Sequence, residues 1–234
     1  MKIKYINKNQ KTDLLIFSGW SFDYKIFETL NFQANFIVCD FIVLKNYQQI
    51  FSDFFYDLKN NNDFYVLCWS MGNYILIDLL QSNYQIFRQK PKKIFMIAAA
   101  LKFDEQLIDN MILELQANKT AALDNFYKKV FFGDKQLYKF FLQNFRDYYV
   151  NLYQTDYLIE TLNYLKICKF QPHILKDYSV ILVHSEKDII APFSDFLEIS
   201  KQLENANTIT TKFTHVPFLY KEVLDKINAE LYNS

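Results

Sequence analysis

The sequence predicts an α/β fold, in which a mostly parallel central sheet is flanked by helices and carries one helical insertion. Short apolar runs alternate with longer stretches in which apolar residues recur at helical spacing. Hydrophobic residues make up 51% of the 234 residues, which is enough for a buried core. A long aromatic segment, from about residue 104 to 169, breaks the alternation with a helical pattern alone.

The expected strands are apolar runs of four to six residues, rich in β-branched or aromatic side chains and bounded by polar residues. They are Leu14–Phe17, Phe36–Cys39, Phe64–Cys68, Ile94–Ala99, Ser179–His184 and Thr208–Phe213. The expected helices are Phe22–Leu30, Tyr47–Lys59, Gly72–Arg88, Phe193–Leu203 and Lys221–Tyr232. Because strands that alternate with helices pair in parallel, we expect helices on both faces of the sheet.

The segment from about 104 to 169 is interpreted as a helical cap inserted into a single domain that spans residues 1–234. Aromatic residues recur along it at helical spacing, and no convincing strand pattern interrupts it. The alternative is a pair of ordinary crossover helices joined by a large connection. No internal repeat or low-complexity linker divides the chain, which favours one domain.

Charge and cysteine content argue against several classes of protein. The 26 Lys and Arg residues balance 26 Asp and Glu residues, whereas nucleic-acid binders usually carry a basic excess. Three cysteines without a C-x-x-C pair and three scattered histidines favour neither a disulfide framework nor a metal site. No signal peptide and no run of about 18 apolar residues is found. We expect a cytoplasmic monomer without cofactor, metal, membrane or nucleic-acid partner.

Glycine is scarce, with 3 residues where average usage of about 7% would give about 16. The remaining glycines, Gly19, Gly72 and Gly133, are therefore expected where a Cβ atom is hard to accommodate.

A serine stands where the third apolar run meets a helix. The residues from Val66 to Gly72 read V-L-C-W-S-M-G, which is the nucleophile-elbow pattern G-x-S-x-G with Cys68 in place of the first glycine. Small residues two positions from Ser70 let the strand and the helix pass closely. Such a turn exposes the Ser70 hydroxyl and directs the Met71 N–H toward a developing oxyanion. The alternative is an ordinary turn with a serine N-cap.

The first apolar run ends in Ser18-Gly19-Trp20, about 50 residues before the serine. A glycine there allows a loop to turn an amide, that of Trp20, toward the same site as a second oxyanion donor. The alternative is a plain strand–helix turn.

His215 is the preferred general base for Ser70. It occupies the loop between the last expected strand and the final helix, at the carboxyl end of the sheet. His184 lies within an apolar strand run, and His173 precedes that strand, so both are less suitable.

Asp188 is the preferred acid to orient His215, because it lies just past the strand that precedes the strand of the histidine. Glu186, two residues earlier, is the rival. The chain order Ser70, Asp188, His215 is typical of α/β-hydrolases.

With these residues, the chain resembles the pimeloyl-acyl carrier protein methyl ester esterases of the BioG type, over most of its length. The resemblance is carried by Phe17–Trp20, Trp69–Gly72, Phe126–Gly133, Asp188 and His215–Phe218. It implies hydrolysis of a methyl ester on the pimeloyl precursor of biotin, with Ser70 as nucleophile and methanol as leaving group. The chain departs from the family at Ser21, where glycine is common, and at Ala98–Ala100.

The resemblance also implies an acyl carrier protein as partner, and carrier proteins are acidic. Residues 119–146 hold six basic and two acidic residues within a neutral chain. The candidate carrier-binding residues are Lys128, Lys129, Lys135, Lys139 and Arg146. The alternative is a solvated helix face.

Two other functions fit the same residues. One is a general short-chain acyl esterase or a thioesterase. The other is a scaffold that binds an acyl group or a partner without turnover.

Overall fold

The computed structural model describes residues 2–40, 64–81 and 90–232. The expected helix Tyr47–Lys59 and the last residues of the expected helix Gly72–Arg88 lie outside these ranges.

A seven-stranded sheet forms the centre of the molecule, in the order β1-β3-β2-β4-β5-β6-β7. Its strands are β1 Lys2–Ile6, β2 Asp13–Phe17, β3 Asn35–Asp40, β4 Phe64–Trp69, β5 Ile94–Ile97, β6 Val180–Ser185 and β7 Asn207–Thr211. Among the described strands, only β1 runs antiparallel, along the edge beside β3. The six expected strands are all present, and the predicted fold class is confirmed.

The edge strand β1 and several element boundaries differ from the sequence-based expectation; strand β7, for example, ends at Thr211 instead of Phe213. Strand β1, Lys2–Ile6, was not predicted, although its charged and apolar residues alternate as in an edge strand. Strand β5 ends at Ile97 instead of Ala99, because Ala98 leaves the extended region with a φ of 50°. The expected helix Phe22–Leu30 shrinks to α1, Lys25–Glu28, because a turn occupies the preceding residues.

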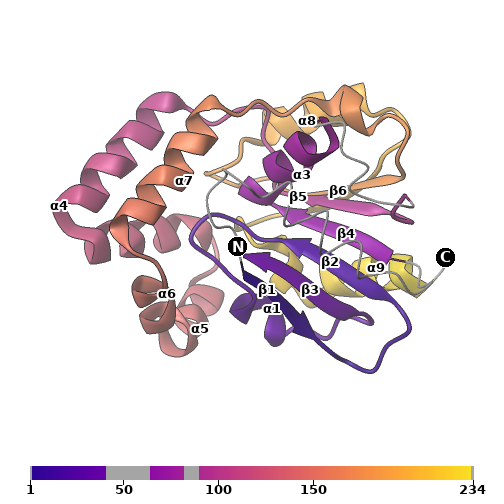
Figure 1. Ribbon diagram of the computed structural model, residues 1–234, viewed down its shortest axis with the longest axis horizontal. Coiled ribbons are helices and arrows are strands. Elements are labelled where there is room, and N and C mark those ends of the chain that lie inside the picture. The colour runs from indigo at the N-terminus through magenta and orange to yellow at the C-terminus, as the bar shows by residue number, and fades with distance from the viewer. Residues whose placement is uncertain (1, 41–63, 82–89, 233–234) are drawn as a thin grey trace.

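Helices cover both faces of the sheet, as parallel strands require. Helices α3 (Met71–Gln81) and α8 (Phe193–Gln202) lie on one face, and α1 and α9 (Lys221–Tyr232) lie on the other (Figure 1). The strands β4, β5 and β6 are buried along nearly their whole length, so the core surrounds them.

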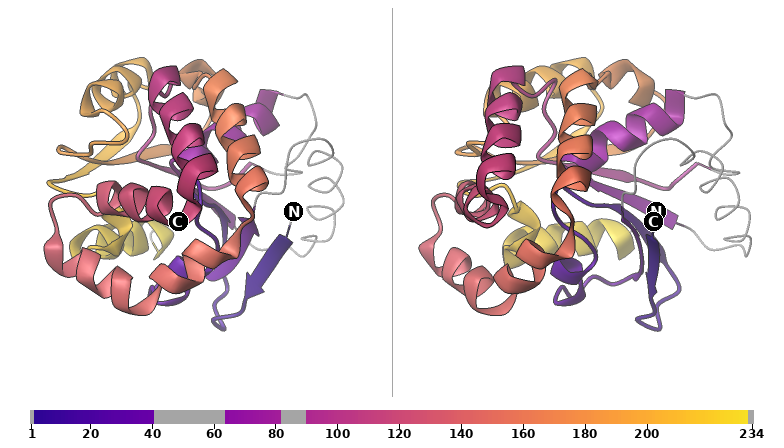
Figure 2. Two further views of the ribbon diagram at one scale, coloured as in Figure 1. Left: turned by 90° about the vertical axis from the view of Figure 1, so that its left-hand side faces the viewer. Right: turned by 60° about the vertical axis from the view of Figure 1, so that its left-hand side comes forward.

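Four further helices stand between β5 and β6 in the chain, and we call them the helical insert. They are α4 Glu105–Val130, α5 Lys135–Asn144, α6 Arg146–Leu152 and α7 Thr155–Ile167. Figures 1 and 2 show them gathered at one side of the sheet, with α4 beside α7. Helix α4 is kinked at Asn118, whose side chain accepts a hydrogen bond from the Ala121 N–H and so caps the second half.

No helix among the described residues is long and apolar enough to cross a membrane. Within the same part of the chain, no cluster of His, Cys, Asp and Glu side chains could hold a metal ion.

Candidate active site

The site lies at the carboxyl ends of β2 and β4, the two central strands between which the strand order reverses. Phe17 pairs with Cys68 across them, so Trp20 and Met71 each stand three residues beyond a paired position. Crevices at such a reversal are the usual ligand sites of open α/β sheets.

Ser70 occupies a strained turn between β4 and α3. Its φ is 53°, in the left-handed region where a non-glycine residue costs about 1–3 kcal/mol. The turn is held against β5, because the Ser70 N–H donates to the Ile97 carbonyl at 2.9 Å. The Asn73 amide donates to the carbonyls of both Ser70 and Ile97, each at 2.9 Å. Asn73 was not predicted as part of the site, although an asparagine in an apolar helix start suggests a buried hydrogen-bonding role.

Gly72 is required by the closeness of α3 to β2. A Cβ atom there would lie 2.2 Å from the carbonyl oxygen of Phe17, a contact that backbone atoms cannot relieve cheaply. Cys68, on the other side of Ser70, is fully buried. We expect small residues at both positions two residues away from Ser70, and the close approach of Phe17 gives the physical reason at Gly72.

Ser70, His215 and Asp188 are joined by two short hydrogen bonds. The Nε2 atom of His215 lies 2.8 Å from the Ser70 hydroxyl oxygen, and its Nδ1 atom lies 2.7 Å from Asp188 Oδ2. All three are buried, with exposed fractions of 6%, 2% and 7% for Ser70, His215 and Asp188. The structure thus brings together the three predicted residues, whereas Glu186 and His173 are exposed elsewhere.

The Asp188 carboxylate is fixed by its own turn. Its Oδ1 atom accepts the backbone N–H groups of Ile190 at 2.8 Å and Ala191 at 3.0 Å, which leaves Oδ2 for His215. Beneath the turn, His184 Nε2 lies 3.0 Å from the Ala191 carbonyl. A carbonyl only accepts, so Nε2 is the donor in this bond, and burial lowers the pKa of the His184 imidazole.

The backbone of the His215 loop is tied to the helical insert and to β4. The His215 N–H donates to the Val130 carbonyl at the end of α4, at 2.8 Å, and its carbonyl accepts the Trp69 indole N–H at 2.7 Å. Gly133 has a φ of +92° and presses against Phe213, where a Cβ atom would lie 2.6 Å from the ring. The third glycine thus supports the loop that holds His215.

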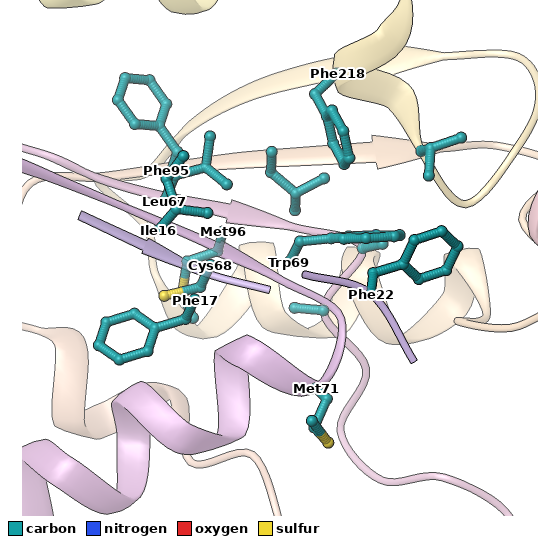
Figure 3. Close-up of a cluster of buried hydrophobic side chains, with 14 of the residues drawn as sticks. Ile16, Phe17, Phe22, Leu67, Cys68, Trp69, Met71, Phe95, Met96 and Phe218 are labelled. Atoms are coloured by element: carbon teal, nitrogen blue, oxygen red, sulfur yellow. The ribbon is translucent and has the colours of Figure 1, made fainter. Parts of the chain in front are cut away.

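Trp69 is the centre of an aromatic cluster below the site. Its ring centroid lies 4.9 Å from that of Phe22 and 5.1 Å from that of Phe218. Figure 3 shows these two side chains beside Trp69. Gly19 packs against the same indole, where a Cβ atom would lie only 2.9 Å from the ring. Trp69 therefore supports both the loop after β2 and the His215 loop.

The loop after β2 forms a tight turn from Gly19 to Phe22, closed by a 3.2 Å hydrogen bond from the Phe22 N–H to the Gly19 carbonyl. Ser21, at the third position, has a φ of 65°, as in a type II turn that favours glycine. Among the described residues, no hydrogen bond occupies the backbone N–H of Trp20 or of Met71. The two backbone N–H groups predicted as oxyanion donors therefore have no hydrogen-bond acceptor among the described residues. They lie just beyond the carboxyl ends of the adjacent strands β2 and β4.

The candidate carrier-binding residues differ in their availability. Lys128, Lys129, Lys135 and Lys139 are exposed on α4 and α5, and within the described part of the chain they form no ion pair. Arg146 instead binds Asp124 through two hydrogen bonds of 2.6 and 2.8 Å and Asp147 through a third of 2.8 Å. Its charge is neutralised by these two carboxylates, so it contributes less to the patch than expected.

Solved structures of esterases and of a bromoperoxidase resemble the chain closely in shape and weakly in sequence. An esterase from Exiguobacterium antarcticum has a TM-score of 0.75 and 17% identity, over 98% of this chain and 92% of the esterase. A bromoperoxidase from Bacillus anthracis has a TM-score of 0.73 and 15% identity, over 98% of this chain and 92% of its own. A thermophilic esterase from Thermogutta terrifontis has a TM-score of 0.72 and 9% identity, over 99% of this chain and 94% of its own.

The chain has the α/β-hydrolase fold. No protein-family model matches it, and no curated protein does. The resemblance to α/β-hydrolases is therefore one of structure, and the BioG-type assignment stays a hypothesis from the sequence motifs.

Proposed function

We propose that the protein is a serine carboxylic ester hydrolase with Ser70 as nucleophile, His215 as general base and Asp188 as the acid that orients His215. The observation that carries the proposal is the pair of hydrogen bonds, 2.8 and 2.7 Å, that link these side chains in order. The α4–α7 helices would form the cap of a single hydrolase domain.

The reaction proceeds in two steps through an acyl-enzyme. Ser70 Oγ attacks the ester carbonyl carbon while His215 Nε2 takes its proton, and the resulting imidazolium is stabilised by Asp188. The Trp20 and Met71 N–H groups donate to the tetrahedral oxyanion. The C–O bond to the alcohol then breaks, and His215 returns the proton to the leaving alkoxide. Water repeats the attack with the same base, which releases the acid and restores Ser70.

For the substrate, we propose a methyl ester of an acyl group, pimeloyl by the sequence resemblance, attached to an acyl carrier protein. The exposed lysines Lys128, Lys129, Lys135 and Lys139 support this choice, because four cations without ion pairs in the described residues attract an acidic partner. Methanol is then the leaving group.

A general short-chain acyl esterase is the second candidate. It is favoured by the names of the structural neighbours, several of which are esterases. It predicts equal efficiency on free and carrier-bound esters, whereas the first candidate predicts a preference for the carrier.

The deciding experiment measures methanol release from pimeloyl-carrier methyl ester beside hydrolysis of para-nitrophenyl acetate. Ser70→Ala should abolish both activities. Reversal of charge in a Lys128→Glu, Lys135→Glu double variant should weaken carrier turnover and spare para-nitrophenyl acetate, while Lys226→Glu on α9 serves as the exposed control. Turnover of the generic ester alone would reject the carrier substrate, and Ser70-independent or absent turnover would reject the hydrolase.

A further inference from the structure

Three side chains of the loop after β2 reach into three different helices of the insert. The Trp20 indole N–H donates to Thr161 Oγ1 on α7 at 2.9 Å. The Ser21 hydroxyl lies 2.7 Å from the hydroxyl of Tyr127 on α4. The carboxylate of Asp23 accepts the hydroxyl of Tyr148 on α6. The loop that makes these contacts is the same loop that carries the Trp20 backbone N–H.

All three loop side chains are buried, and of their partners Tyr148 is half-buried. In such surroundings a lost partner leaves a polar group unsatisfied at a cost of about 1–3 kcal/mol. Trp20 is further enclosed by an edge-to-face contact with Phe126 of α4, with ring centroids 4.7 Å apart. The second Asp23 oxygen accepts the Lys25 N–H at 2.9 Å, so the carboxylate links the insert to the start of α1.

The backbone conformation of Ser21 is the reason why the loop needs contacts from outside it. A left-handed φ of 65° in a residue other than glycine persists only where the surroundings hold it. The bond to Tyr127 holds the Ser21 side chain, while Ser18 Oγ bonds the Phe22 carbonyl at 3.0 Å across the turn. If Ser21 relaxed, the Trp20–Ser21 and Ser21–Phe22 peptides would rotate and the hydrogen bond from Phe22 to Gly19 would break. The Gly19–Trp20 peptide, which carries the Trp20 N–H, would then no longer be held by the turn.

We infer that Tyr127, Tyr148 and Thr161 of the insert are positioning residues that set the direction of the Trp20 N–H toward the oxyanion. The insert thereby determines the geometry of the oxyanion hole, in addition to enclosing the site. This inference rests on the proposed function, since it presumes that Trp20 donates to a reaction oxyanion.

The test compares two tyrosines that share the same chemistry. Tyr148 and Tyr164 both belong to the insert, and both donate a hydroxyl hydrogen bond to an aspartate outside it, Asp23 and Asp78 respectively. Only the Asp23 bond anchors the loop, because Asp78 lies on α3. Tyr148→Phe is therefore the test variant and Tyr164→Phe is its matched control.

Tyr127→Phe is a second test variant, which decides the question alone if Tyr148→Phe fails to fold. Thr161→Val with Thr161→Ser as its rescue completes the set. The readouts are kcat and KM for para-nitrophenyl acetate and the inhibition constant of trifluoroacetophenone. That ketone forms a tetrahedral adduct with Ser70, and the oxyanion of the adduct needs the Trp20 N–H. Its inhibition constant therefore reports the geometry of the oxyanion hole and not general packing.

We expect Tyr127→Phe and Tyr148→Phe to lower kcat by about 10- to 100-fold, since loss of a whole oxyanion donor costs about 100- to 1,000-fold. KM should change by less than about twofold, and the ketone should bind more weakly in proportion to kcat. Tyr164→Phe should leave all three values unchanged.

Unchanged kcat in both test variants, or an equal loss in Tyr164→Phe, would overturn the inference. Failure of the proposed function is recognised separately, because the wild-type protein itself would then show no Ser70-dependent turnover. That result would overturn the positioning role together with the hydrolase.

Discussion

Gly72→Ala is the substitution whose cost the structure determines most sharply. The added methyl group would lie 2.2 Å from the Phe17 carbonyl oxygen and 2.7 Å from its carbon, whereas real Cβ atoms essentially never approach closer than 3.0 Å. The separation of α3 from β2 must therefore grow by at least the 0.8 Å between 2.2 and 3.0 Å. Strand β2 cannot yield, because it is hydrogen-bonded to β3 on one side and β4 on the other.

The expected loss follows from two opposing terms. Overpacking of a well-packed core costs about 1–3 kcal/mol, occasionally more. Because the partner of the added methyl group is rigid backbone, we expect Gly72→Ala to lie at the upper end of this range. Replacement of a helical glycine by alanine returns about 1 kcal/mol of helix propensity. The net loss is at least about 2 kcal/mol, which lowers the melting temperature by about 4–8 °C for a chain of this size.

Thermal denaturation followed by circular dichroism measures this loss. Gln81→Ala, an exposed substitution at the far end of the same helix, should leave the melting temperature unchanged. Because Ser70 lies just before α3, Gly72→Ala should also lower the rate of ester hydrolysis below that of Gln81→Ala. A Gly72→Ala variant that melts at or above the wild-type temperature would refute the close-approach argument.

Three further outcomes follow from the same contacts. Asp188→Asn should lower kcat for para-nitrophenyl acetate by about 10³- to 10⁴-fold through loss of the His215 orientation, whereas Glu186→Gln should not; equal effects would contradict the assignment. His184→Phe leaves the Ala191 carbonyl without its partner and should cost about 1–3 kcal/mol in urea unfolding, and an unchanged free energy of unfolding would contradict the support of the Asp188 turn. Burial raises the pKa of four tyrosines above 10.0. Because only the unfolded chain then ionises them freely, stability should fall as the pH rises through 10.0, and part of the absorbance of the 17 tyrosines should appear only with unfolding; full tyrosinate absorbance in the folded protein would disagree. These four residues are Tyr74, Tyr127, Tyr149 and Tyr164.

The linear pattern of the chain was enough to predict the central strands and the residues around Ser70. Buried parallel strands are apolar runs, and the motif around Gly72 follows from the crossing of one strand and one helix, both local features. Chain order and loop position were enough to choose Asp188 over Glu186 and His215 over His184, and the hydrogen bonds among the described residues agree with that choice.

Features that depend on distant parts of the chain could not be predicted in the same way. The hydrogen-bond partners of Ser21 and Trp20 lie 106 and 141 residues away in the chain, so no local sequence pattern predicts them. The pairing of Arg146 with Asp124, 22 residues earlier, likewise required the packing of α6 against α4. Strand β1 was not predicted because only its pairing with β3 distinguishes an edge strand from a polar terminus.

The central claim is that Ser70 is a nucleophile activated by His215, and labelling by a fluorophosphonate tests it most directly. The reagent phosphonylates an activated serine with loss of fluoride, and peptide mass spectrometry locates the adduct. We expect one adduct on Ser70 in the wild-type protein, absent in Ser70→Ala and strongly slowed in His215→Ala. A folded wild-type protein that gains no adduct, or gains it on another serine, would contradict the claim.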